Sequence, residues 1–282
     1  MSRQVESQII ACRSGVARIY SMLQTTPSRW QDYVPFARSL TTSLDAVDFV
    51  SIAGRAEEQV WFIDGIQRLA YSDADSGGVR DLADWCQRKW LGLLQFQPQL
   101  VEALKGLGQS WLLRAQNPLA QIHDEESISS SSRSPSVSNN NNRVQTANYV
   151  EAREFLLPST EFFKRAVDAA EVQHRVNGAL LALAAEAYLS LGNVSTPNEG
   201  IEYFGQAVRY LRRARQIPRY PLPPHLQQLV PHASTFLDPV DAFVVDFCMT
   251  MEGMSTEPGF SDSRFWQVCG FVFVPINSIL DD

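Results

Sequence analysis

One acidic residue and one histidine stand at the spacing of a metal-binding helix. Glu171 and His174 are three residues apart, a spacing that places two ligands on the same helix face in di-iron bundles. Such a centre needs a second pair of this kind and two further glutamates. The remaining histidines, at positions 123, 225 and 232, have no acidic residue three positions earlier. We therefore interpret the pair as part of a solvent-exposed helix face and predict no metal or cofactor.

The sequence pattern supplies no base for a catalytic nucleophile. A reactive serine or cysteine needs a base beside it, yet there is no Gly-x-Ser-x-Gly sequence, and no cysteine (Cys12, Cys86, Cys248, Cys269) has a histidine nearby. Gly106-Leu107-Gly108 lacks the third glycine of a dinucleotide site, and the sequence has no phosphate-binding loop. We predict that the chain is not an enzyme. The alternative is a helical enzyme or metal protein whose site is assembled from distant residues.

Four arginines form a basic cluster near position 210. They are Arg209, Arg212, Arg213 and Arg215, and the first three share one helix face at three- and four-residue spacing. Together with Arg219 they are candidates to bind an acidic peptide, a phosphate or nucleic acid. The alternative is a solvated face near a helix C-terminus, where the helix dipole favours cations.

A low-complexity segment interrupts the chain between Gln121 and Thr146. It contains serines at 129–132 and asparagines at 139–142, and it has almost no apolar side chain to bury, so it is expected to be disordered. Ser134 precedes a proline and follows Arg133, which makes it a candidate phosphorylation site.

The rest of the chain up to residue 220 shows helical periodicity. Apolar residues recur at three- and four-residue spacing, and no stretch alternates with period two. We predict an all-α fold with four parts: N-terminal helices over 1–120, a disordered linker over 121–147, helices over 148–220 and an irregular acidic tail over 221–282. Two prolines fix predicted boundaries: Asn117-Pro118 ends the fifth helix, and Leu157-Pro158-Ser159 starts the next.

Two segments resemble the centre of a tetratricopeptide repeat, a pair of antiparallel helices of about 34 residues. They are Ala187–Asn193 and Gly200–Val208. The resemblance implies that Tyr188 packs between the two helices and that Gly192 permits the turn after the first. It also implies that four residues line the inner face of the second helix: Ile201, Phe204, Ala207 and Val208. Pro218 then closes the unit, and the expected architecture is a right-handed stack of antiparallel helix pairs.

The sequence departs from the repeat pattern at one point, and a second copy of the pattern is weaker. Residues 194–199 make the expected turn between the helices longer than usual. A weaker copy of the pattern is found at Leu104, Leu107-Gly108, Trp111 and Ala120, but its second helix would run into the low-complexity segment. The number of repeats therefore stays open.

The formal net charge of −7 belongs to the end of the chain. Eight acidic residues and one basic residue, Arg264, lie between Leu226 and Asp282, and residues 1–225 have no net charge. Overall acidity argues against a general nucleic-acid binder, but this argument is weaker for the neutral helical part. Two explanations of the tail remain open: a docking segment that folds against the arginine-rich helix, and translated intron sequence.

These observations together favour an adaptor over an enzyme. We expect a non-enzymatic module that binds a partner protein in a helical-repeat groove, in the cytoplasm or nucleus of a eukaryotic cell of fungal or similar type. The sequence contains no apolar segment of membrane-spanning length. A factor that binds nucleic acid through the Arg209–Arg219 face is a further alternative.

Overall fold

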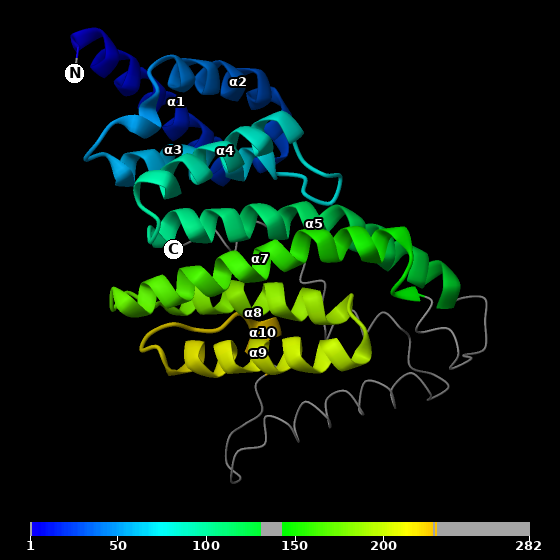
Figure 1. The fold of residues 1–282 in the computed structure, drawn as a ribbon. Helices are drawn as coiled ribbons and strands as arrows, with labels where there is room; N and C mark the ends of the chain where they lie inside the picture. Colours follow the sequence, from blue (N-terminus) through cyan, green and yellow to red (C-terminus); the bar gives the residue numbers. More distant parts are fainter. Residues whose placement is uncertain (1, 131–142, 228, 230–282) are drawn as a thin grey trace. The chain divides into compact units, whose positions relative to one another are not determined.

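The computed structural model describes residues 2–130, 143–227 and 229. This part of the chain is helical and contains no strand, so the all-α prediction is confirmed there (Figure 1). The chain forms two compact units, residues 1–114 and 115–282. None of the described helices combines the length and the apolar character that a membrane-spanning helix needs.

The first unit is built from four helices and the beginning of a fifth. Its elements are α1 (Arg3–Thr25), a 3-10 turn (Pro27–Arg29), α2 (Trp30–Ala46), a second 3-10 turn (Phe49–Ser51), α3 (Ala56–Ala70), α4 (Arg80–Phe96) and the start of α5 (Val101–Ser130). Helix α1 packs against α2 and α3, and α3 packs against α4. The apolar stripe of each helix faces the others, so that Ile19, Ile63 and Ile66 are completely buried.

Two buried glutamines connect the elements of this unit. The Gln59 amide donates hydrogen bonds to the carbonyl oxygens of Phe49, Val50 and Ile52, which holds the second 3-10 turn against α3. The Gln67 amide group donates to the carbonyl of Gly106 at 3.1 Å, and its oxygen accepts from the Trp90 indole at 2.7 Å. Because both amide ends are paired, α3, α4 and α5 are joined without an unpaired polar group at this point.

Within the described residues, the second unit contains the rest of α5 and four further helices. These are α7 (Ala147–Val172), α8 (Gly178–Asn193), α9 (Pro197–Gln216) and the short α10 (Pro224–Gln227). Helix α8 lies between α7 and α9 and packs against both (Figure 1). Most of its alanine and leucine side chains are buried, including every residue from Leu180 to Ala185.

Two prolines that were expected to mark helix ends lie inside helices instead. The predicted end of the fifth helix at Asn117-Pro118 is wrong, because α5 continues to Ser130. Pro118 cannot donate to the carbonyl of residue 114. However, Leu119, which directly follows it, and Ile122, one turn later, are only 2% and 0% exposed. Burial of these two side chains stabilises the continuation, at roughly 1.5–3 kcal/mol each.

The predicted helix start at Pro158 is also wrong. Helix α7 begins eleven residues earlier, at Ala147, and Pro158 lies in its interior. Leu156 and Phe163 are fully buried on either side of the proline, and the Thr160 hydroxyl donates to the carbonyl of Leu157 at 2.9 Å. Packing on both sides therefore outweighs the missing backbone hydrogen bond.

The first residues of the predicted tail fold onto the second unit. Leu222, Leu226 and Leu229 are all less than 8% exposed, and His225 Nε2 lies 3.3 Å from Glu186 Oε1 on α8. The rest of the tail and the centre of the low-complexity segment lie outside the described residues, so the predictions made for them stay predictions.

Candidate partner-binding surface

The turn between α8 and α9 is shorter than the sequence indicated. It consists of Val194, Ser195 and Thr196, because α9 already begins at Pro197. Glu199 stabilises this start by accepting hydrogen bonds from the backbone N–H and the hydroxyl of Thr196, a capping box. The expected long turn is therefore wrong.

Small residues allow close packing of these two helices. A Cβ atom on Gly192 would lie 2.6 Å from the ring of Phe204, so glycine allows the close contact with that ring. Gly192 lies within α8 and has no positive φ, so the turn after the helix does not itself require glycine there. Ala207 is fully buried and Val208 nearly so, while Ile201 and Phe204 are half-buried. The predicted inner face of α9 is thus confirmed at its centre. The weaker copy of the repeat is not supported, since residues 104–120 form part of one continuous helix.

Three tyrosines form a cluster on the second unit, which we call the tyrosine cluster: Tyr188 of α8 with Tyr203 and Tyr210 of α9. The ring centroid of Tyr188 lies 6.3 Å from that of Tyr203 and 5.8 Å from that of Tyr210. Tyr188 therefore packs between the two helices, as the repeat pattern predicts. Tyr188 and Tyr203 are half-buried, whereas Tyr210 is buried. Tyr203 and Tyr210 are seven residues apart, a spacing that places them on one helix face and could have indicated the cluster from the sequence.

Acidic side chains of α7 border the tyrosine cluster. Burial, the neighbouring tyrosines and the charges of Glu161 and Asp168 raise the pKa of Tyr188 to about 12. Burial also raises the pKa of Tyr210. These phenols are therefore neutral near pH 7 and remain hydrogen-bond donors beside an acidic helix face.

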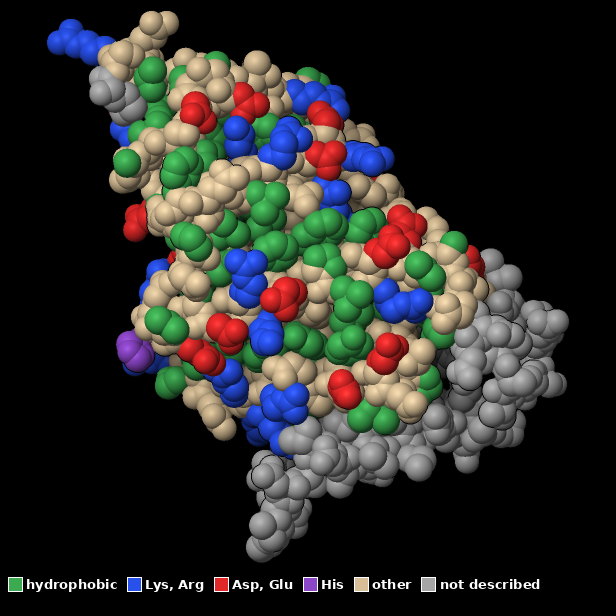
Figure 2. Space-filling view, in the orientation of Figure 1, with side chains coloured by type: hydrophobic (Ala, Val, Ile, Leu, Met, Phe, Trp, Pro, Cys, Tyr) green, Lys and Arg blue, Asp and Glu red, His purple; other side chains and the backbone are tan. Residues whose placement is uncertain are grey.

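The same face of α7 exposes apolar side chains. Val150, Leu157 and Val172 are 36%, 48% and 82% exposed. Leu157 and Val172 lie within about 40° of Glu161 and Asp168 around the helix axis, since each residue turns the helix by about 100°. We call this row of residues on α7, together with the tyrosine cluster, the α7–α9 surface. Figure 2 shows apolar side chains interspersed with charged ones over these helices.

The predicted arginine cluster divides between the two sides of α9. Arg213 forms an ion pair with Glu171 of α7, and Arg209 donates to Gln206 Oε1 at 2.7 and 2.9 Å. Arg213 therefore belongs to the side of α9 that faces Glu171 and carries Tyr210. Arg212 and Arg215 have no hydrogen bond or ion pair with any described residue. Figure 2 shows basic side chains gathered over α9.

The Glu171–His174 pair does not form a metal site in the described part of the chain. Glu171 binds Arg213, and His174 follows the end of α7 with a backbone φ of 53°. The helical spacing that would align the two side chains is lost there. No group of three or more potential ligands is found among the described residues. Ser134, the candidate phosphorylation site, lies outside them.

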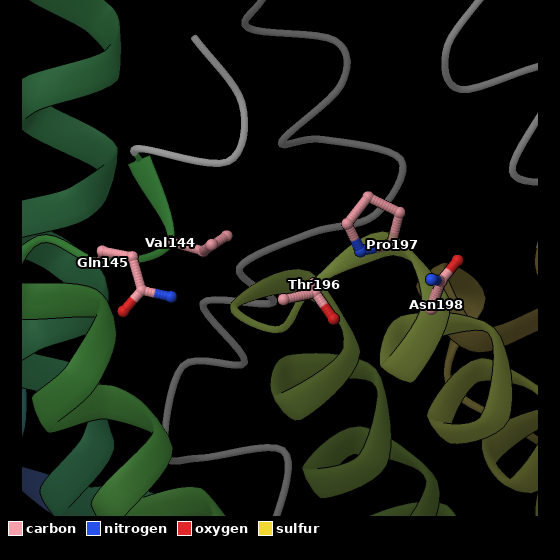
Figure 3. A pocket seen from close by; sticks show the side chains of 5 residues that line it. All are labelled: Val144, Gln145, Thr196, Pro197 and Asn198. Atoms are coloured by element: carbon pink, nitrogen blue, oxygen red, sulfur yellow. The ribbon is translucent and has the colours of Figure 1, made fainter. Parts of the chain in front are cut away.

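A cavity of about 450 Å³ is found at the start of α9. It is lined by Val144 and Gln145, which precede α7, and by Thr196, Pro197 and Asn198 (Figure 3). None of these five described lining residues has an ionisable side chain.

Comparison with known proteins identifies no relative. No family model matches the sequence, and no curated protein or solved structure shows significant similarity to it.

Proposed function

We propose that this chain is a non-enzymatic adaptor that binds a partner protein through the α7–α9 surface. The proposal includes a tetratricopeptide-like stack and a eukaryotic cytoplasmic or nuclear setting. The observation that carries it is that exposed Leu157 and Val172 share a face of α7 with Glu161 and Asp168, whose charges act on the half-buried Tyr188. Tyrosines at the centre of a surface are frequent energetic anchors of protein interfaces.

The charges around the tyrosine cluster indicate the chemistry of the partner. Glu161 and Asp168 act on Tyr188, and Glu199 and Glu202 act on Tyr203. A segment with basic side chains around an apolar or aromatic residue complements such a surface. The apolar residue of the partner segment would cover Leu157 and the tyrosine rings. Its basic residues would pair with the four carboxylates named above.

Affinity purification with mass spectrometry tests the proposal. Full-length wild type is compared with two charge-reversal variants. The first carries both Glu161→Lys and Asp168→Lys on the proposed surface, and the second carries Glu57→Lys alone as a control. Glu57 is exposed on α3 and forms no ion pair with a described residue. We expect a reproducible partner that is retained by the control and lost with the double variant, while circular dichroism shows that all three proteins are folded.

Leu157→Ser provides a second variant without a change of charge. It should weaken the same interaction, whereas Ile10→Ser, at a similarly exposed position on α1, should not. A partner that binds both α7 variants as well as wild type does not use this surface. If no partner is recovered with wild type, the adaptor function itself is rejected.

A further inference from the structure

The end of α9 carries a concentration of positive charge that the described residues do not neutralise. Residues 209–219 contain five arginines and no acidic residue. Arg213 alone of the five has an acidic partner within the described ranges, namely Glu171. Arg212, Arg215 and Arg219 form no ion pair there, and we call these three residues the arginine edge.

The arginine edge is under electrostatic and conformational strain. Arg212 and Arg215 are three residues apart, so their like charges lie close together on the helix surface and repel each other. Arg219 has a backbone φ of 64°, a left-handed conformation that residues other than glycine rarely adopt. The helix dipole compensates part of the repulsion, but a negative counterpart would stabilise this region further.

The chain itself supplies a segment of opposite charge directly after the arginine edge. Residues 230–282 contain eight acidic residues and one arginine. The described chain leads toward them from the second unit, because Leu222, Leu226 and Leu229 are buried there. The first three acids, Asp238, Asp241 and Asp246, occur within seventeen residues of Leu229.

The length of the segment is sufficient to reach the arginine edge. Helix α9 has 20 residues and is therefore about 30 Å long at about 1.5 Å per residue. The nine residues from Leu229 to Asp238 span up to about 30 Å at about 3.3–3.6 Å per residue. Asp238 and the acids after it can thus approach any part of α9 without a change in the described helices.

We propose that residues 230–282 dock on the arginine edge of the same molecule through their carboxylates. Arg212 and Arg215 turn away from the side of α9 that carries Arg213 and the tyrosine cluster, by about 100° and 160° around the helix axis. Arg212 and Arg215 therefore lie outside the α7–α9 surface. In this proposal the negative charge of residues 230–282 balances the positive charge at the end of α9.

Arginine modification in the intact protein tests this interaction. Phenylglyoxal reacts with accessible guanidinium groups, and peptide mass spectrometry gives a rate for each arginine. In full-length wild type at low salt, Arg212, Arg215 and Arg219 should react more slowly than Arg3, which is exposed in α1. A variant of the tail replaces three aspartates together: Asp238→Asn, Asp241→Asn and Asp246→Asn. It should raise the reaction rates of the three arginines by about threefold to tenfold, the range that a few exposed ion pairs supply. Added salt should have a similar effect on wild type.

A matched variant removes acids elsewhere on the molecule. Glu57→Gln, Asp124→Asn and Glu151→Gln change exposed carboxylates without a described ion pair, and they should leave the three rates unchanged. Rates equal to that of Arg3 in wild type would overturn the proposal. Equal reaction rates of the three arginines in the triple aspartate variant and in wild type would also overturn it. So would protection of these arginines that rises with protein concentration, which would indicate binding by a second copy, or protection that requires added RNA.

Discussion

The substitution Gly106→Ala tests the packing at the centre of the first unit. On an open helix this change is favourable, because alanine has the higher helix propensity by about 1 kcal/mol. At this position, however, the new Cβ would lie 2.5 Å from Trp90 Cε2 and 2.7 Å from Trp90 Cζ2. Trp90 is 1% exposed, so the indole has no free space into which it can move.

The expected cost has two components that oppose this gain. Overpacking a close-packed core costs about 1–3 kcal/mol. Displacement of the indole also breaks its 2.7 Å hydrogen bond to Gln67 Oε1, and an unpaired buried acceptor costs about 1–3 kcal/mol. With the gain in helix propensity subtracted, we expect the free energy of unfolding to fall by about 1–5 kcal/mol.

Urea unfolding followed by tryptophan fluorescence measures this change. In a Trp266→Phe background the five remaining tryptophans all lie in the first unit: Trp30, Trp61, Trp85, Trp90 and Trp111. The midpoint urea concentration should fall with an unchanged slope. The control is Gly92→Ala in α4, whose Cβ would meet only Val50 Cγ1, at 3.2 Å; its midpoint should change by much less.

A double-mutant cycle separates steric overlap from other effects. Trp90→Phe shortens the ring system, so Gly106→Ala should cost less in that background than in wild type. A midpoint that rises with Gly106→Ala alone would show that the indole moves freely, and the packing argument would then be refuted.

Three further predictions concern single side chains. Gln59→Leu removes the side-chain donor to the carbonyl oxygens of Val50 and Ile52, and one of two donors to that of Phe49. It should lower the free energy of unfolding by about 1–3 kcal/mol, measured in the same urea assay; an unchanged midpoint would contradict the role of the amide. Hydrogen bonds from Thr196 lower the pKa of Glu199, so its carboxylate stabilises the folded state above the ordinary pKa, and this contribution is lost as pH falls through the lowered value. Glu199→Gln should differ from wild type in thermal unfolding at pH 7, and the difference should shrink as the pH is lowered; a difference that does not change with pH would contradict the lowered pKa. The pKa of Tyr188 is raised from 10.0 to about 12, so its contribution to stability is complete below pH 10 and is lost as pH rises toward 12; Tyr188→Phe should therefore show a smaller loss of stability over this interval, and an identical pH profile would exclude the shift.

Local patterns in the sequence predicted the helix pair α8–α9 well. Gly192, Ala207 and Tyr188 take the positions that the repeat pattern assigned to them, because each is determined by contact between two helices that are adjacent in the chain. The prolines at 118 and 158 misled the boundary predictions for the opposite reason. Whether a proline ends a helix depends on the burial of residues on both sides of it, and the tertiary structure determines that burial.

The candidate surface was less accessible to sequence reasoning. The arginine cluster was identified, but its division between two sides of α9 depends on Glu171, which lies 42 residues before Arg213 in the chain. The exposure of Leu157 could not be read from an apolar residue in a helical pattern, because such residues are normally buried. The pairing of Gln67 with Trp90 likewise joins two helices, and neither residue type indicates its partner.

The composition of α8 has a consequence for biosynthesis. Its largely buried surface is covered partly by α9, which the ribosome makes later. At about 5–20 residues per second, the 20 residues of α9 take about 1–4 s to synthesise. During that interval the side of this alanine- and leucine-rich helix that packs against α9 has no cover. A chain that terminates before Pro197 never gains this cover and is expected to aggregate.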